Sequence, residues 1–260
     1  MPSIILLLLN VINTEEEDSV NYKIAHYLLN NTSSFKSFST SSIAEGCNVS
    51  KATISRFCKK IGVDSFYELK YMFQDRKSDL EEKYGLVVGH ENSHSYFINQ
   101  AISSMMSLNE NLDGYLLSNL IEDIFKYKKV AMFGHMQSGS IAISMQHELF
   151  SSGKMVDTRI PFMAQKKYIE EATEENLIIA FSSSGTYFSR IFQNEEFFNK
   201  SNAPKIYLIT TSSIKKPSYI DHVIALPNNN MLESSLILEC YAKLIALKYY
   251  EHVNGNLNNT

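Results

Sequence analysis

Residues 42–62 read SIAEGCNVSKATISRFCKKIG, and the second half of this stretch carries both end signals of a short helix. Ser50 is a good N-cap, because its hydroxyl can accept a hydrogen bond from a backbone N–H group of the first turn. Gly62 suits the left-handed residue that follows a helix. The stretch therefore predicts a helix over Ser50–Ile61, preceded by a shorter helix that ends near Asn48.

The two faces of the predicted helix differ in chemistry. Its apolar face consists of Ile54, Phe57, Cys58 and Ile61, which recur at helical spacing. The opposite face suits the DNA major groove, where Arg56 can bridge to a guanine and Lys59 can neutralise a phosphate. The residues predicted to contact DNA are Ser50, Lys51, Ala52, Thr53, Ser55, Arg56, Lys59 and Lys60. An amphipathic helix in any small bundle has the same periodicity, so this pattern alone leaves that alternative open.

Charge is distributed unevenly along the 260 residues. Between Ser19 and Lys77, nine Lys and Arg residues stand against four acids, so this window carries +5 although the whole chain carries −4. A basic segment in an acidic chain indicates a separate module that binds nucleic acid. The three cysteines are too scattered for a disulfide framework, and reduced thiols in a cytoplasmic protein are expected.

Residues 20–84 have a helical rhythm with no convincing strand. A helix predicted over Ser65–Glu82 has Phe66, Leu69, Tyr71 and Phe73 for burial. The opening apolar run, Ile4–Leu9, is far shorter than the roughly 20 residues that span a bilayer. We expect this run to begin a helix that packs on another part of the protein or on a second subunit, and we expect no contact with a membrane.

The rhythm changes after Lys129, where short apolar runs alternate with helical stretches. The runs are Val130–Phe133, Met155–Thr158, Leu177–Phe181, Ile206–Thr210 and Val223–Leu226. The helical stretches are Ser140–Ser152, Ala164–Thr173, Tyr187–Phe198 and a long last helix, Met231–His252. This alternation predicts a doubly wound, five-stranded parallel sheet with helices on both faces. The predicted fold class is thus an all-helical domain (residues 1–85), a linker (86–107) and an α/β domain (108–260).

The N-terminal segment resembles the DNA-binding domain of RpiR-type regulators. The resemblance rests on Ser-x-x-Thr-x-x-Arg-Phe-Cys-Lys-Lys-x-Gly, from Ser50 to Gly62, and on Phe-x-x-Leu-Lys, from Phe66 to Lys70. It implies a helix-turn-helix that binds DNA as a dimer and controls genes related to sugars. A homodimer or homotetramer with two-fold symmetry predicts an operator that is an inverted repeat.

Two turns in the second half are rich in glycine and serine. The first reads Gly134-His-Met-Gln-Ser138 and the second reads Ser182-Ser-Ser-Gly-Thr-Tyr187, and each follows a predicted strand. Turns at the carboxyl ends of parallel strands bind ligands, and backbone N–H groups at a helix start can hold a phosphate. Plain strand-to-helix connections have similar sequences, so this signal is weak by itself.

Both turns also resemble those of the sugar isomerase (SIS) domain, which follows the DNA-binding domain in RpiR-type regulators. The resemblance covers about residues 108–250 and implies a bound phosphorylated sugar. The predicted ligand-binding residues are Gly134, His135, Ser138, Ser182, Ser183, Ser184, Gly185, Thr186 and Tyr187.

The chain departs from the SIS pattern at two positions. Met136 stands where the first turn usually has its second glycine, and Tyr187 stands where a serine or threonine usually follows the second turn. Either side chain can narrow the pocket. An altered site, a site for a different ligand and a site that has lost its ligand therefore all stay open.

These patterns together predict a cytoplasmic DNA-binding regulator that responds to a sugar phosphate, without catalytic residues, metal or cofactor. The alternative is a phosphosugar isomerase or lyase, which needs a general base such as His135, His147 or Glu148. A dedicated isomerase has no need for the basic helix, and a purely structural protein is disfavoured because two motif sets agree. His90 and His94 have the spacing of two metal ligands, but no third ligand is evident and a surface pair is expected.

Overall fold

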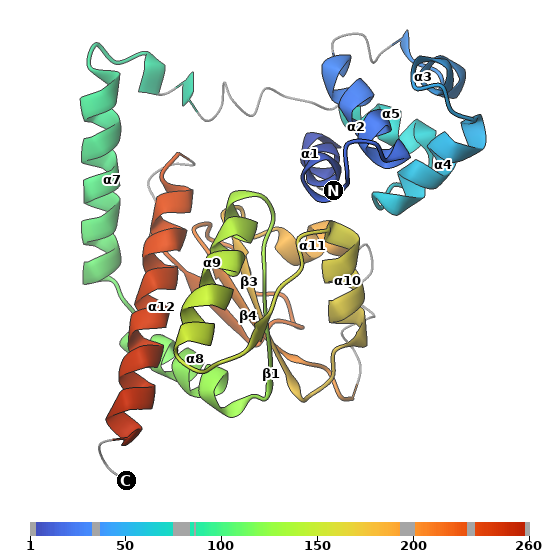
Figure 1. Ribbon diagram of the computed structural model, residues 1–260. Helices are drawn as coiled ribbons and strands as arrows, with labels where there is room; N and C mark the ends of the chain where they lie inside the picture. Colours follow the sequence, from blue (N-terminus) through green and yellow to red (C-terminus); the bar gives the residue numbers. More distant parts are fainter. Residues whose placement is uncertain are drawn as a thin grey trace. The chain divides into compact units, whose positions relative to one another are not determined.

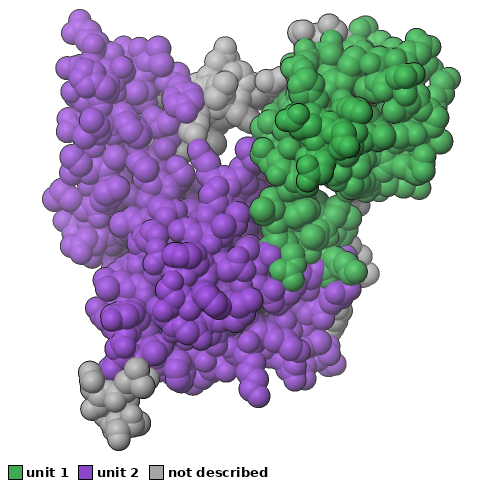
Figure 2. Space-filling view, viewed as in Figure 1, with its two compact units in different colours: residues 1–79, 159–167 green, residues 80–158, 168–260 purple. Residues whose placement is uncertain are grey.

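The computed structural model describes residues 4–32, 37–74, 84–85, 87–192, 201–227 and 232–257. The chain divides into two compact units, residues 1–79 with 159–167 and residues 80–158 with 168–260 (Figure 2). Among the described helices, none combines the length and the apolar character that crossing a membrane requires.

The N-terminal residues of the first unit form helices. These are α1 (Ile4–Thr14), α2 (Val20–Asn30), α3 (Thr40–Gly46), α4 (Lys51–Lys60) and α5 (Phe66–Gln74) (Figure 1). In α1, Ile4, Leu7, Leu8 and Val11 are buried, and the helix contacts α2 and α5. The opening apolar run therefore packs inside its own unit, which is one of the two outcomes expected for it.

Serine side chains fix the starts of three of these helices. Ser19, Ser39 and Ser50 each accept a hydrogen bond from a backbone N–H group of the first turn. Removing such a cap typically lowers the free energy of unfolding by about 1 kcal/mol. α4 is followed by Gly62, whose φ is 81°. Both end signals predicted for this helix are confirmed.

The burial predicted for α5 is confirmed only in part. Leu69 and Phe73 are buried one turn apart on the same face. The prediction that Tyr71 is buried is wrong, because this residue lies about 200° around the helix from Leu69 and is 61% exposed. Residues 75–82 of the predicted helix lie outside the described residues.

The second unit is built on a parallel sheet with the strand order β2-β1-β3-β4-β5. The strands are β1 (Lys129–Phe133), β2 (Val156–Asp157), β3 (Asn176–Ser182), β4 (Lys205–Thr210) and β5 (His222–Ala225). The chain moves outward from β1 to β2 and then returns to β3 on the other side of β1. Such a reversal places a crevice at the carboxyl ends of β1 and β3. The predicted doubly wound, five-stranded fold is confirmed.

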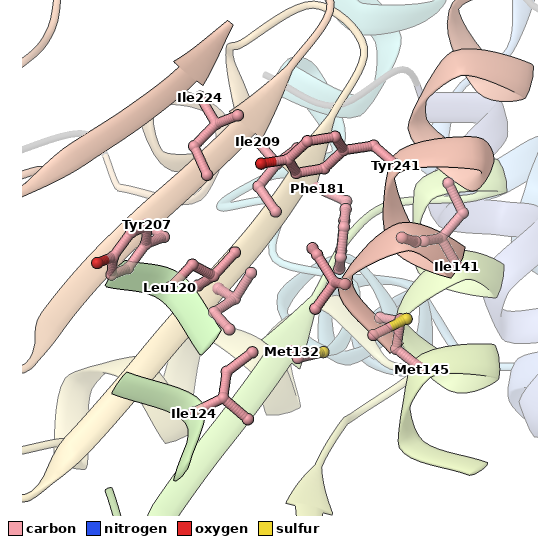
Figure 3. Close-up of a cluster of buried hydrophobic side chains, with 14 of the residues drawn as sticks. Leu120, Ile124, Met132, Ile141, Met145, Phe181, Tyr207, Ile209, Ile224 and Tyr241 are labelled. Carbon is pink, nitrogen blue, oxygen red and sulfur yellow. The ribbon is translucent and has the colours of Figure 1, made fainter. Parts of the chain in front are cut away.

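Helices cover both faces of the sheet. One face carries α8 (Gly114–Lys126), α9 (Gln137–Ser151) and α12 (Ser234–Leu257) (Figure 1). The other carries α11 (Tyr187–Ile191) and the part of α10 (Phe162–Glu171) that belongs to this unit, from Tyr168 on. The main apolar core lies under the first three helices, where Met132, Phe181 and Ile209 of the strands meet Ile141 and Tyr241 (Figure 3). Because both faces are covered, the strands are continuous apolar runs rather than alternating ones.

α7 (Ser93–Glu110) precedes α8 and begins inside the stretch predicted as a linker. Its buried residues are Ala101, Ser104 and Leu108, and it contacts α12. The predicted long last helix corresponds to α12, although its first predicted residue, Met231, lies outside the described residues. Residues 193–198 of the predicted helix Tyr187–Phe198 also lie outside them. The exact domain boundaries stay a prediction.

Candidate nucleic-acid interface and ligand site

α4 has the two faces that its sequence predicts. Ile54, Phe57 and Cys58 are buried, whereas Lys51, Ala52, Ser55, Arg56, Lys59 and Lys60 are exposed and Thr53 is half-buried. Burial raises the pKa of the Cys58 thiol to about 11, so this cysteine packs as a neutral apolar group. The helix therefore presents a basic outer face on an apolar base.

Hydrogen bonds order the first turns of α4. The Ser50 hydroxyl accepts from the Thr53 backbone N–H at 3.1 Å and lies 2.9 Å from the Thr53 hydroxyl. The Arg56 guanidinium donates to the same Thr53 oxygen at 3.2 Å. This chain of contacts holds Arg56 toward the start of the helix, the end that usually enters the major groove.

The cations of α4 are not equivalent. Lys60 forms an ion pair with Glu15, which follows α1, and this contact lowers the pKa of the Glu15 carboxyl. Within the described residues, Lys51 and Lys59 have no ion-pair partner. Lys60 thus has a structural contact as well as its predicted role, while Lys51 and Lys59 present their charge to solvent.

The predicted ligand residues lie at adjoining strand ends. β1 and β3 are neighbours, with Phe133 paired to Ala180, so the turns that follow them share one edge of the sheet. Ser138 in the first turn of α9 and Ser182 at the end of β3 are buried. Ser183, Ser184, Gly185 and Thr186 are half-buried, and the hydroxyls of Ser184 and Thr186 lie 2.6 Å apart. The arrangement gathers hydroxyl groups beside the N-terminus of a 15-residue helix.

Two glycines permit these turns. A Cβ atom at Gly134 would lie 2.5 Å from the backbone of Ser138, so any side chain there would push the turn off the helix. Gly185 has a φ of 70°, and a Cβ atom there would lie 2.6 Å from Ile214. Met136 adopts φ 52° and ψ −116°, which is glycine-like backbone at the position where the resemblance predicts a glycine. Backbone strain is thus concentrated in the first turn.

Aromatic groups close one side of the second turn. Tyr187 is 1% exposed, and its ring centroid lies 4.9 Å from that of half-buried His135. Burial, and then the nearby Arg190, lowers the pKa of His135 to about 4, so its imidazole is neutral near pH 7. Burial also raises the pKa of the Tyr187 phenol. The site therefore offers an anion hydroxyl groups and helix N–H groups, beside a neutral imidazole.

Several hydroxyl groups at the end of β4 and directly after it complete the second turn, and sequence reasoning missed them. Thr210, Thr211 and Ser212 donate to the carbonyl oxygen of Ser183 at 3.4, 3.0 and 2.7 Å. These bonds fix the serine turn from the neighbouring strand. The signal in the sequence was the hydroxyl-rich run at 210–213, directly after a predicted strand.

Glu233 is a second residue that sequence reasoning missed. It is fully buried, and it lies between β5 and α12, at the same edge of the sheet as the two turns. α9 and α12 both run back from this edge, and Lys243 of α12 pairs with Glu148 of α9 at 2.5 Å. Ser138 on α9 and Glu233, directly before α12, each lie ten residues before a member of this ion pair, so an equal rise per residue places them near the same level. The signal in the sequence was an acidic residue in the first turn of the predicted long helix Met231–His252.

Two of the three alternative catalytic groups, His147 and Glu148, lie away from the crevice. His147 is exposed on α9, and Glu148 is engaged by Lys243, which lowers the pKa of its carboxyl. Both are more than two turns along α9 from Ser138. His90 and His94 are exposed, and His90 stacks on Tyr96 at 3.8 Å. Among the described residues, no group of three or more His, Cys, Asp or Glu side chains is placed to hold a metal ion.

Comparison with known proteins finds a family that matches the N-terminal helices. The rpiR family of helix-turn-helix domains matches residues 7–79. The HTH-type transcriptional regulator HexR of Pseudomonas aeruginosa is 23% identical over 175 residues, which are 66% of this chain and 61% of HexR. The uncharacterized HTH-type transcriptional regulator TTE0211 of Caldanaerobacter subterraneus is 31% identical over 130 residues, 46% of this chain and 44% of that protein. The matched segment thus covers about three fifths or less of the length of each of these relatives.

Solved structures share the fold. The Vibrio vulnificus NanR protein complexed with ManNAc-6P matches with a TM-score of 0.51 and 12% identity, over 98% of this chain and 97% of NanR. The protein MJ1247 of Methanococcus jannaschii, with an inferred function of 3-hexulose-6-phosphate isomerase, matches with a TM-score of 0.50 and 18% identity, over 61% of this chain and 92% of MJ1247. Residues 7–79 therefore match the rpiR family of helix-turn-helix domains, and the chain as a whole shares the fold of the NanR structure.

Proposed function

We propose that this protein is a transcriptional regulator of sugar-metabolism genes whose DNA affinity is set by a phosphorylated sugar. The basic outer face of α4, inside an rpiR-family domain, is the observation that carries this proposal. The named regulators among its relatives support it. In this proposal the protein acts in the cytoplasm and catalyses no reaction.

The DNA-binding half uses α4 as the recognition helix. Small residues at its start, such as Ala52, let the backbone approach the bases. Arg56 is held by Thr53 toward that start, which favours a role in reading a base. Lys51 and Lys59 neutralise phosphates, and Lys60 adds to them if the Glu15 pair opens on DNA.

The ligand half uses the crevice between the turns after β1 and β3. The phosphate lies at the first turn of α9, where the start of the helix provides backbone N–H groups and the hydroxyl of the buried Ser138. Ser182, Ser184 and the backbone from Gly185 to Thr186 bind it from the other side. The NanR structure, which shares the fold, was solved with a phosphorylated amino sugar, and this supports the class of ligand.

The enzyme alternative is favoured by one observation, the likeness of the α/β unit to MJ1247. Against it, His147 and Glu148 lie along α9 away from the crevice. His135 has a pKa of about 4, so it is a weak base near pH 7. Coupled assays with fructose 6-phosphate and other sugar phosphates test this alternative, and turnover that is lost in Ser138→Ala would establish it.

We also propose a homodimer, or a higher even oligomer, on an inverted-repeat operator. Because α1 packs inside its own unit, the apolar surface for this contact comes from other helices. α7 exposes Ile98, Ile102 and Met106, which supports a partner surface on the α/β unit. Light scattering at micromolar concentration should give an even multiple of the chain mass. A monomer that still binds its operator would refute the dimer.

The proposal as a whole is tested by DNA selection and calorimetry on the full chain. Selection from random duplexes should return an inverted repeat with half-sites about one helical turn, or a multiple of it, apart. Titration with hexose, pentose and amino-sugar phosphates should find a ligand that changes the affinity for that duplex. A pool without any enriched sequence would overturn the regulator, whereas a selected operator with no ligand would overturn only the ligand half.

A further inference from the structure

A buried hydrogen bond joins α7 to the start of α12. The Ser104 hydroxyl donates to the Glu233 carboxylate at 2.6 Å. Ser104 is 1% exposed and Glu233 is fully buried. A bond to a carboxylate is about twice as strong as one between neutral groups, and it counts most where water is excluded. This contact therefore fixes α7 on the α/β unit.

Apart from this bond, few side chains of α7 are fully buried. Its buried stripe consists of Ala101, Ser104 and Leu108, two of which have small side chains. The apolar residues beside this stripe are exposed, with Ile102 at 51% and Met106 at 59%. Within one subunit, α7 adds two fully buried apolar residues, Ala101 and Leu108, and the half-buried Tyr96 and Phe97. The Ser104–Glu233 bond is therefore a substantial part of what fixes α7 on its own subunit.

The acceptor of this bond belongs to the ligand edge of the sheet. The pairing of Lys243 with Glu148 indicates that Glu233 lies near the level of Ser138 and the first turn of α9. A phosphate bound at that turn brings negative charge to the edge where a buried carboxylate already lies. Like charges repel strongly in a medium of low dielectric constant. Occupancy of the crevice therefore disfavours the present placement of the Glu233 carboxylate.

We propose that the Ser104–Glu233 hydrogen bond is a latch that reports ligand occupancy to α7. In the empty protein the latch holds α7 on α12, and an anion in the crevice weakens it. In the sequence, α7 lies between the helix-turn-helix residues and the sheet. Its release therefore changes how the DNA-binding domain is connected to the α/β unit. The latch rests on the proposed function, because it transmits the binding of the same sugar phosphate. Such a two-state element, biased by a ligand, is what coupling between distant sites requires.

Amide hydrogen exchange on the full chain tests the latch. Ser104→Ala should speed the exchange of the α7 amides about tenfold, as expected for the loss of a hydrogen bond to a charged group. The matched control is Ser103→Ala, because Ser103 is the neighbouring, exposed serine of the same helix. Adding fructose 6-phosphate, ribose 5-phosphate or N-acetylmannosamine 6-phosphate should speed the exchange of α7 in the wild-type chain. In Ser104→Ala the same probes should bind by calorimetry and produce no further change in α7.

The Glu233→Gln variant removes the negative charge of the latch but keeps an acceptor for its hydrogen bond. Glutamine keeps an oxygen that can accept from Ser104, so α7 should stay protected without a probe. Because the repulsion is gone, a bound probe should no longer loosen α7, which a merely structural role for Glu233 would not predict. A loosening in Glu233→Gln equal to that in the wild-type chain would overturn the mechanism.

The failures of the latch and of the proposed function are distinguishable. If none of the probes binds the wild-type chain, the proposed ligand site fails and the latch fails with it. If a probe binds and changes DNA affinity while the exchange of α7 stays constant, only the latch is overturned. Equal exchange of α7 in Ser104→Ala and Ser103→Ala would also overturn it.

Discussion

Met136 holds a backbone conformation that an L-amino acid with a side chain rarely adopts, at φ 52° and ψ −116°. Such strain lowers the stability of the folded state by roughly 1–3 kcal/mol, and contacts in the surrounding turn have to offset this cost. We expect Met136→Gly to raise the free energy of unfolding by about 1 kcal/mol, because relief of strain exceeds the added entropy of the unfolded chain. Urea denaturation measures this. Ser140→Gly, inside α9, should instead lower it by up to about 1 kcal/mol, and a Met136→Gly variant no more stable than the wild type would show that the turn is unstrained.

Arg56 and Lys59 lie on the same exposed face of α4, but they are expected to act differently on DNA. Arg56→Ala should cost about 1–3 kcal/mol of operator affinity and relax the preference at one base pair. Lys59→Ala should weaken binding to all sequences alike and make the dependence on salt shallower, because one phosphate contact is lost. Gel-shift titrations at several salt concentrations measure both effects. Lys126→Ala, an exposed cation of α8, is the control, and unchanged affinity in both α4 variants would remove this helix from recognition.

At the scale of elements, the sequence predicts best where one physical signal dominates. The apolar run Leu177–Phe181 is buried on both faces as β3, and Ser50 and Gly62 bracket α4 as expected. The contact of Ser104 with Glu233 joins residues 129 positions apart, so no local pattern encodes it. The hydroxyls that bind the Ser183 carbonyl depend in the same way on β4 lying beside β3.

α8 is fastened to the sheet by a polar contact at the amino-terminal end of β4. The Tyr207 hydroxyl donates to Asp123 at 2.6 Å, and Lys205 pairs with the same carboxylate at 2.7 Å. Tyr207→Phe should lower the free energy of unfolding by about 1–3 kcal/mol, because a bond to a charged group is lost while the ring stays packed. The control is Tyr115→Phe, since Tyr115 is 77% exposed. Equal denaturation midpoints for the two variants would show that the Tyr207 bond adds nothing.

For the whole molecule, two half-buried histidines predict how stability depends on pH. Burial lowers the pKa of His135 to about 4 and also lowers that of His222, whereas histidine in an unfolded chain titrates near 6.5. The unfolded state therefore binds more protons below about pH 6.5, and stability is lost as the pH falls from there toward 4. Urea denaturation should give a lower free energy of unfolding at pH 5 than at pH 7.5, and the difference should be smaller in His135→Asn. Glu15 and Glu148, whose pKa values are lowered from 4.5, contribute below that window, so a loss confined to pH values below 4.5 would contradict the role of the histidines.

The regulatory switch is also a property of the whole molecule, because it joins the crevice to α4. A ligand shifts a conformational equilibrium only by its different affinities for the two states. A coupling of about 1–3 kcal/mol would change operator affinity roughly 5- to 150-fold. Ser184→Ala removes the hydroxyl that lies 2.6 Å from that of Thr186, so it should weaken sugar-phosphate binding and leave ligand-free DNA affinity unchanged. Ser118→Ala, which changes an exposed serine of α8, should leave both unchanged. Operator affinities measured with and without the sugar phosphate decide the matter, and a full ligand response in Ser184→Ala would place the phosphate elsewhere than in this turn.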